Sequence, residues 1–255
     1  MIISYSQLNK LAMCPHSYKL RYRDRIKMAP SMSLIWGSSL HHAAQLYLSD
    51  KLTIGHPSKD EIYQALMLEY YYNKIKTEGL RVLKGEDKNQ IIAENEEGLI
   101  RTLPVLIENL SEIEPEYVEM KFKARIKENI SLVGYVDCID IFGVIHDLKT
   151  GKKSKSQKDA DSSMQLTAYK YLAENEGIEI SGLQLDALTT LKTKVKWDVF
   201  KTTRTSDDYV VLANHIEALE KAIETETYTP NTNGWWCSPK CCEYYNTCKY
   251  VRREA

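Results

Sequence analysis

The segment IHDLKTGKK, residues 145–153, places a carboxylate and an ammonium group two positions apart at the end of a short apolar run. On a β-strand side chains alternate between faces, so Asp147 and Lys149 should point the same way while Leu148 points into the packing layer. Such a pair is either a metal-binding acid with a companion base or an ordinary surface ion pair. These three residues alone do not decide between the two.

A second acid, Asp137, precedes Asp147 on the neighbouring predicted strand. If the turn between the strands is centred on Phe142, the two acids lie directly opposite each other, with Cβ atoms about 4.5–5.5 Å apart. Carboxylates that close repel unless one is protonated or a cation lies between them, and a hard cation such as Mg²⁺ or Mn²⁺ would remove the repulsion. Lys149 could then orient water or stabilise charge on a phosphate. Asp137 could also be a strand-end acid near a turn, and Asp140, of opposite parity, is expected to be structural.

Composition restricts the class of protein. The 255 residues are 43% hydrophobic, which is enough to bury a full core. No segment is long and apolar enough to cross a bilayer, so we expect a soluble cytoplasmic protein with no membrane partner. The net charge of −1 gives no global sign of a polyanionic partner. Two basic runs, residues 19–27 and 149–158, are each either a solvated face or a phosphate-contacting one.

Helical periodicity dominates the first half of the chain. Ser58 and Glu61 predict a capping box in front of an amphipathic helix, and its inward residues should be Ile62, Ala65, Leu66 and Leu68. The other helices are predicted over residues 5–13, from about 37, over about 90–110, over 162–176 and over 207–225. From Val118 the period changes to two, and strands are predicted over residues 118–126, 130–142, 144–150, 183–191 and 195–201. The predicted fold class is α/β, a central mixed sheet flanked by helices.

These elements carry motifs that resemble the RecB-like branch of the PD-(D/E)xK nuclease superfamily. GYVDCIDIFGVIHDLKTGKK resembles the branch's Gly-x-x-Asp strand followed by an Asp-x-Lys strand ending in Thr-Gly. GSSLHH resembles its upstream Gly-x-x-x-His helix, and QLTAY resembles its Gln-x-x-x-Tyr helix. An early Cys-Pro pair with the tail WCSPKCCEYYNTC resembles the four cysteines by which a subset, including AddB-type and CRISPR-adaptation nucleases, binds an iron–sulfur cluster. The motifs occur in the family's order and span residues 4–250.

The resemblance implies one nuclease domain over residues 1–255. Its parts would be a mainly helical region, 1–115, a catalytic sheet with the Gln-x-x-x-Tyr helix, 116–202, and a helix with a cysteine-rich tail, 203–255. It implies a Mg²⁺ or Mn²⁺ ion held by His41, Asp137, Asp147 and the backbone carbonyl of Leu148. The catalytic residues that it implies are Asp137, Asp147, Lys149, Gln165 and Tyr169.

The candidate site residues can also be interpreted from their chemistry and spacing. Gln165 and Tyr169 are one turn apart on a helix, so together they could hold a phosphate oxygen or the lysine, or they could be ordinary helix surface. His41 and His42 point about 100° apart, so only one of them can face the site, and the family position favours His41. Glu119 could face the same sheet surface, but nothing in the sequence places it there.

Six cysteines in a reducing compartment should not form disulfides. A thiolate cluster suits either tetrahedral zinc or iron–sulfur, and spacing alone separates these poorly. Three close cysteines in the tail and one near the N-terminus would tie the two ends of the chain together. The resemblance implies a 4Fe-4S cluster on Cys14, Cys237, Cys242 and Cys248, with Cys241 as the alternative to Cys242. The tail's aromatic and basic residues could stack bases of a single strand or pack around the cluster.

The resemblance therefore implies a metal-dependent DNA exonuclease that hydrolyses phosphodiester bonds in single strands or at DNA ends. Its context would be recombination, repair or phage DNA processing. Two alternatives remain at this point: a nuclease subunit that trims spacer precursors in CRISPR adaptation, and a noncatalytic module that binds DNA ends. Protein partners in recombination or CRISPR adaptation would fit these roles.

Overall fold

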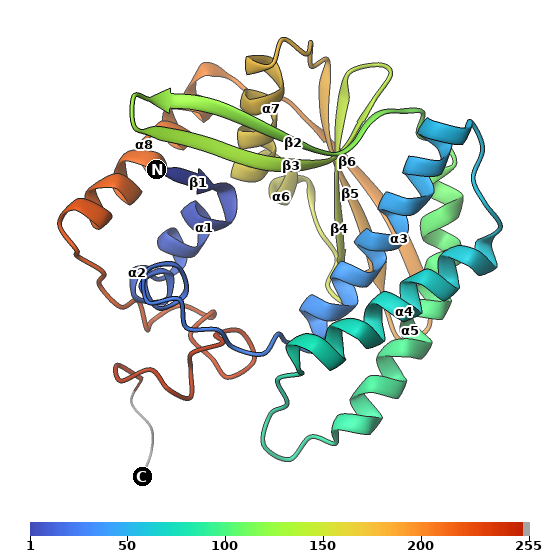
Figure 1. Cartoon of the computed structure of the whole chain (residues 1–255), viewed down its shortest axis with the longest axis horizontal. Helices are drawn as coiled ribbons and strands as arrows, with labels where there is room; N and C mark the ends of the chain where they lie inside the picture. The colour runs from blue at the N-terminus through green and yellow to red at the C-terminus, as the bar shows by residue number, and fades with distance from the viewer. Residues whose placement is uncertain (252–255) are drawn as a thin grey trace.

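The computed structural model describes residues 1–251 and shows a mixed six-stranded sheet with helices on both sides (Figure 1). The strands are β1 Ile2–Ser4, β2 Pro115–Lys127, β3 Ile130–Asp140, β4 Val144–Gly151, β5 Gly182–Thr190 and β6 Val195–Thr202. The helices are α1 Tyr5–Met13, α2 Pro15–Tyr18, a π-helical turn η1 Lys19–Arg23, α3 Met32–Ile54, α4 Asp60–Glu78, α5 Lys88–Leu110, α6 Gln157–Asp161, α7 Met164–Asn175 and α8 Ser206–Glu224. The predicted α/β class is confirmed.

Strand β3 organises the sheet because three strands pair with it. β2 runs antiparallel along one edge. The other edge is divided: β1 pairs in parallel with residues 131–133, and β4 pairs antiparallel with Cys138 and Ile139. Between these two ladders, residues 134–137 of β3 have no strand partner on that edge within the described chain. This interruption leaves space beside Asp137 for side chains from other elements.

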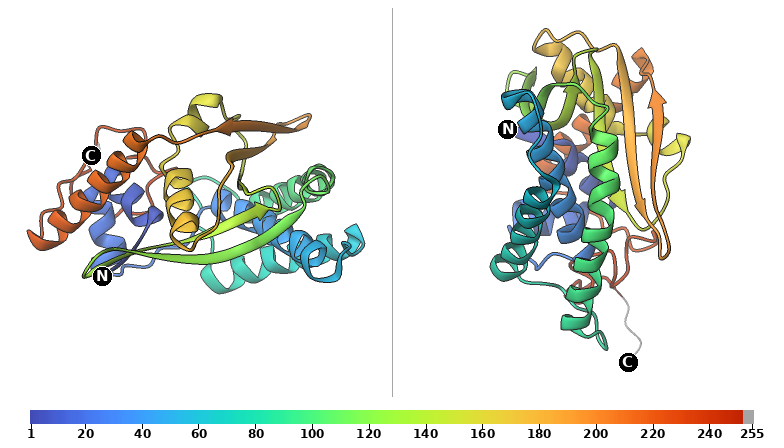
Figure 2. Two further views of the ribbon diagram at one scale, coloured as in Figure 1. Left: turned by 90° about the horizontal axis from the view of Figure 1, so that it is seen from above. Right: turned by 90° about the vertical axis from the view of Figure 1, so that its right-hand side faces the viewer.

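The β2–β3 hairpin extends well beyond the remaining strands and bends away from them (Figures 1 and 2). Within β2, Glu119 has a φ of 48°, in the left-handed region that non-glycine residues rarely adopt. The ladder is in register on either side, with Val118 opposite Cys138 and Met120 opposite Val136. A strained backbone of this kind persists where the surroundings hold it, and it often marks a functional site.

Two apolar clusters lie on opposite sides of the sheet, as strand alternation requires. Along β4, Ile145 packs with residues of α1, α7 and α8, whereas Leu148 packs with α3, α4 and α5. Figure 2 shows α3, α4 and α5 grouped on one side of strands β4–β6. The sheet therefore has helices on both sides at the level of β4, and the site residues lie between them.

Several predicted elements differ from the structure. The helix predicted from about residue 37 begins at Met32, and the short helix α6 was not predicted. The capping box is wrong, because Ser58 instead hydrogen-bonds Asp50 and the hydroxyl of Tyr63, and α4 begins at Asp60. The inward face of α4 is also wrong: its buried residues are Tyr63, Met67 and Tyr71.

The C-terminal tail, from residue 225 to 251, consists of turns and packs against the N-terminal helices (Figure 1). Tyr244 is buried and donates its hydroxyl proton to the carbonyl of Ile26. Glu243 pairs with both Lys10 and Arg21. The two ends of the chain are thus held together by direct contacts. Within the described residues, no helix combines the length and the apolar character that a membrane crossing needs.

Candidate active site

On β4 the buried Asp147 forms an ion pair with the partly buried Lys149. The Lys149 Nζ lies 2.7 Å from Asp147 Oδ1, and none of the Asp147 side chain is exposed. An ordinary surface ion pair is therefore excluded. Lys149 Nζ also donates to Oε1 of Gln165 at 3.0 Å. Burial, opposed mainly by the Lys149 charge, raises the pKa of Asp147.

Asp137 lies next to this pair where β3 and β4 separate. The observed pairs Cys138 with His146 and Ile139 with Ile145 give the register centred on Phe142 that the sequence predicts. Beyond these pairs, the backbone N–H of Leu148 donates to Asp137 Oδ2 at 2.9 Å. Burial is also the main cause of the raised pKa of Asp137. Two desolvated carboxylates thus lie near each other, with one lysine to compensate them.

The second carboxylate oxygen of Asp147, Oδ2, is buried and has no hydrogen-bond partner among the described residues. A buried carboxylate oxygen without a partner carries a substantial desolvation cost. A cation at this position would supply the missing interaction and would reduce the repulsion between Asp137 and Asp147. The site therefore fits a hard metal ion with oxygen ligands.

The side chain of His41, from the middle of α3, lies near Asp137. Its Nδ1 lies 3.8 Å from Asp137 Oδ2. Burial, followed by the positive charge of Lys149, lowers the pKa of His41 to about 4, while Asp147 and the backbone of Leu148 act in the opposite direction. The imidazole is therefore neutral near pH 7 and keeps a lone pair for a metal. His42 does not share this environment, since its ring stacks on Tyr70 at a centroid distance of 4.5 Å.

Glu119 forms a cluster with His41 and Asp137 that the sequence analysis did not predict, and Asp147 is not part of that cluster. One ligand atom each from His41, Glu119 and Asp137 all lie within 4.8 Å of one another. Burial and then the Asp137 charge raise the pKa of Glu119 to about 7. The strand alternation across β2 and β3 could have indicated that Glu119 lies opposite Asp137. The left-handed backbone of Glu119 has no signal in the sequence.

Helix α7 brings Gln165 and Tyr169 to the other side of the pair. The Gln165 amide donates to the Tyr169 hydroxyl at 2.6 Å and accepts from Lys149, so the three side chains form one chain of hydrogen bonds. Gly134 permits the close approach of the helix, because a Cβ there would lie 2.9 Å from Leu172 Cδ1 and 3.2 Å from the Tyr169 ring. Burial is the main cause of the raised pKa of Tyr169.

Two further residues, Tyr5 and Asp140, have contacts that indicate their roles. Tyr5, the first residue of α1, lies close enough for the charges of Lys149 and Asp147 to affect it, although burial is the main cause of its raised pKa. The sequence argument treated it only as the start of a helix. Asp140 is structural, as predicted: its Oδ1 accepts the backbone N–H groups of Phe142 and Val144 in the β3–β4 turn.

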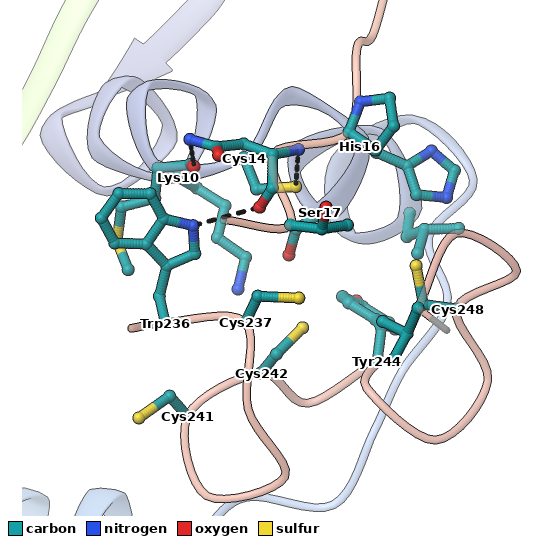
Figure 3. Close-up of a pocket in the computed structure, with 16 residues that line it drawn as sticks. Lys10, Cys14, His16, Ser17, Trp236, Cys237, Cys241, Cys242, Tyr244 and Cys248 are labelled. Atoms are coloured by element: carbon teal, nitrogen blue, oxygen red, sulfur yellow. Dashed lines mark hydrogen bonds between the residues drawn. The ribbon is translucent and has the colours of Figure 1, made fainter. Parts of the chain in front are cut away.

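The cysteines of the two chain ends line one cavity (Figure 3). Cys14 follows α1, and Cys237, Cys242 and Cys248 come from the tail. Burial, followed by the thiolate charges of Cys242, Cys14 and Cys248, raises the pKa of Cys237, so these sulfurs act on one another. Cys241 also borders the cavity, but it is exposed and its sulfur points away from the sulfurs of Cys237 and Cys242 (Figure 3).

The spread of these sulfurs bears on the kind of group that they could hold. Four thiolates around one zinc ion at about 2.3 Å lie roughly 3.8 Å apart. Within residues 1–251 no three cysteine sulfurs lie within 4.8 Å of one another. Among the described residues the sulfurs are therefore not arranged as a preformed zinc site.

The chain was compared with protein families, solved structures and curated proteins, and the first two comparisons found matches. The model of the PD-(D/E)XK nuclease superfamily matches residues 2–249. A crystal structure from Eubacterium rectale, named "Putative exonuclease", has a TM-score of 0.56 and 13% sequence identity, and the match covers 100% of this chain and 90% of that one. The crystal structure of SSO0001 has a TM-score of 0.42 and 13% identity, with coverages of 98% and 86%. No curated protein matches.

Proposed function

The chain belongs to the PD-(D/E)XK nuclease superfamily, and we propose that it is a Mg²⁺- or Mn²⁺-dependent deoxyribonuclease that removes nucleotides from single strands or DNA ends. The observation that carries this proposal is the fully buried Asp147, whose Oδ2 has no hydrogen-bond partner in the described chain and whose pKa is raised by burial and also by the nearby charge of Asp137. Removing the carboxylates of Asp137 and Asp147 from water costs free energy unless a cation compensates their charge. DNA processing in recombination or repair is the role that fits such an enzyme.

The proposed ligands are His41, Asp137, Asp147 and the backbone carbonyl of Leu148. Glu119 joins this set, because its carboxylate lies in the cluster with His41 and Asp137. Oxygen ligands with one imidazole suit Mg²⁺ and Mn²⁺. When bound, such an ion lowers the pKa of a water molecule and withdraws charge from a phosphate.

Lys149 is the proposed catalytic cation. Held between Asp147 and Gln165, its ammonium group is fixed in position and can donate to a water molecule or to a phosphate oxygen that gains charge in the transition state. Gln165 and Tyr169 keep Lys149 oriented and offer uncharged groups for a phosphate oxygen. Because these groups are preorganised by packing, they need no rearrangement during the reaction.

The test is digestion of end-labelled single- and double-stranded DNA. Release of labelled mononucleotides or short products from the ends, only with added divalent ion, supports the proposal. A protein that binds DNA ends tightly and leaves the label intact with every divalent ion would be a noncatalytic end-binding module instead.

We further propose that Cys14, Cys237, Cys242 and Cys248 hold a 4Fe-4S cluster that joins the two ends of the chain. The shared cavity and the outward direction of Cys241 support this set. When bound, the cluster would cross-link segments that are more than 200 residues apart and would stabilise the tail against α1 and α2.

The affinity for Mn²⁺ should depend on pH through Glu119. In the metal-free protein its pKa of about 7 exceeds the ordinary 4.5, so protonation stabilises the fold at low pH, and this stabilisation is lost as the pH rises through about 7. A metal requires the ionised form, so Mn²⁺ affinity should fall as the pH drops below about 7. Calorimetric titration of wild type and Glu119→Gln across this range measures the effect.

The matched control is Glu116→Gln, an exposed acid on the same strand. Glu119→Gln should bind Mn²⁺ more weakly and with a flatter pH profile, whereas Glu116→Gln should follow wild type. Identical profiles for all three proteins would remove Glu119 from the ligand set.

The two adjacent histidines should differ in their effects. His41→Ala should reduce metal affinity and activity together, by about 10- to 100-fold or more, because a ligand is lost. His42→Ala removes only the stacking on Tyr70 and should leave both quantities near wild type. Manganese titration with cleavage assays of both variants decides this, and the reverse order of effects would show that the ligand assignment is wrong.

A further inference from the structure

The β2–β3 hairpin carries an exposed basic face that the proposed cleavage site does not use. Phe122 and Ala124 are buried in the cluster that contains α7. Lys121, Lys123 and Arg125 alternate with them, so they lie on the opposite, exposed side of the strand. Figure 2 shows α7 on one side of the hairpin, and between Lys121 and Arg125 only the residues that face that side are buried. The other side forms the outer face of the hairpin.

An aromatic ring belongs to the same outer face. Tyr135 of β3 lies directly opposite Lys121 in the ladder, and 53% of it is exposed. The Lys121 Nζ lies 5.9 Å from the centroid of the Tyr135 ring. A tyrosine this exposed on a strand does not contribute to a core, but it offers a flat surface for stacking.

The positive charges of the outer face are not neutralised by the protein. Within residues 1–251, Lys121, Lys123 and Arg125 form no salt bridge, and Arg125 donates only to the backbone carbonyl of Glu128. The next basic residue, Lys127, differs because it pairs with Glu217 and Glu220. Three unpaired cations in a row, at every second strand residue, are available to an extended polyanion.

The outer face begins at the metal ligands. Glu119 precedes Lys121 by two residues on β2, and Asp137 follows Tyr135 by two residues on β3. Two strand residues span about 7 Å, so the first lysine and the tyrosine lie one short step from the site along each strand. From there Lys123 and Arg125 continue away from the site toward the hairpin turn.

We propose that the outer face binds single-stranded DNA next to the bond that is cleaved, with Lys121, Lys123 and Arg125 on successive phosphates and Tyr135 stacked on a base. This inference rests on the proposed nuclease function, and it names the substrate as a single strand. Sites for single strands combine a positive track with aromatic rings that stack on bases. In a duplex the bases are already paired and stacked, so Tyr135 would gain no such contact.

The experiment measures binding of a labelled oligothymidylate by fluorescence anisotropy in EDTA, so that no cleavage occurs. For single strands, the slope of log affinity against log salt changes by about 0.7 for each phosphate contact. Lys121→Ala/Lys123→Ala should therefore flatten the slope by about 1.4. Tyr135→Ala should weaken binding about tenfold, because a stacked base is lost, whereas Tyr135→Phe should retain the affinity.

The matched control is Lys192→Ala/Lys194→Ala, which removes two exposed charges from the β5–β6 turn and should leave affinity and slope unchanged. Wild-type slope in Lys121→Ala/Lys123→Ala would overturn the inference. So would an equal loss of duplex binding in Tyr135→Ala. If such variants bind normally while the wild type cleaves DNA, only the binding face is wrong. If the wild type binds through this face and cleaves nothing, the nuclease proposal fails instead.

Discussion

Asp147→Asn and Lys149→Met should each lose DNA cleavage by about a hundredfold to a thousandfold or more while remaining folded, because each removes a charge that acts at the reacting phosphate. Asn keeps the shape of Asp147 but removes the charge that would hold the metal. Met keeps the length of Lys149 without its ammonium group. Initial rates of cleavage at saturating Mn²⁺, with circular dichroism to verify folding, measure the effect.

Strand β6 provides a control, because Lys196 and Asp198 repeat the same two-residue spacing and, like Lys149, are partly buried. Lys196→Met and Asp198→Asn should cleave DNA at the wild-type rate. Thermal unfolding adds a second measurement. At about 100 times its Kd, a metal adds about 2.7 kcal/mol of stability, which for a chain of this size corresponds to a rise in Tm of about 5–10 °C. Asp147→Asn should not show this rise, and an unchanged rise would mean that the metal binds elsewhere.

Protein purified without oxygen should be brown and contain iron and sulfide in the ratio of one 4Fe-4S cluster per chain. Cys14→Ala or Cys248→Ala should bleach it. Both variants should also make the tail more sensitive to proteolysis than the sheet, because the cluster closes a loop of more than 200 residues. Iron and sulfide analysis together with limited proteolysis measure these effects.

Cys241→Ala is the matched control for the cluster, since its sulfur points away from the sulfurs of Cys237 and Cys242 (Figure 3). It should remain brown, whereas Cys242→Ala should not. Stoichiometric zinc with negligible iron in anaerobic protein would replace the cluster by a zinc site. The nuclease proposal would then still rest on Asp137, Asp147 and Lys149.

Local patterns in the sequence were sufficient for most strands and for the register at the site. Alternation identified β2 and β3, and the turn centred on Phe142 correctly predicted how β3 and β4 pair. These features depend on side-chain period and loop length, which a sequence displays directly. The capping box predicted at Ser58 was wrong because of a tertiary contact. The Ser58 hydroxyl donates a hydrogen bond to Asp50, which lies on α3.

The buried face of α4 was also predicted wrongly because tertiary contacts decide it. Aliphatic residues were expected inside, but Tyr63, Met67 and Tyr71 are buried, and both tyrosine hydroxyls find partners: Asp50 for Tyr63 and the carbonyl of Ile92 for Tyr71. A tyrosine can be buried when its hydroxyl reaches a partner, and only the packed structure shows that it does. Likewise, Glu119 lies in the site with a left-handed backbone, which no pattern in the sequence indicates.

The most direct test of the central claim is the digestion of end-labelled single-stranded DNA by the wild-type protein, compared in EDTA and in Mg²⁺ or Mn²⁺. The account predicts no release of label in EDTA, steady release of label with either ion, and no release from Asp147→Asn under the same conditions. Release that continues in EDTA, or that Asp147→Asn performs at the wild-type rate, would contradict a metal-dependent nuclease centred on Asp137, Asp147 and Lys149.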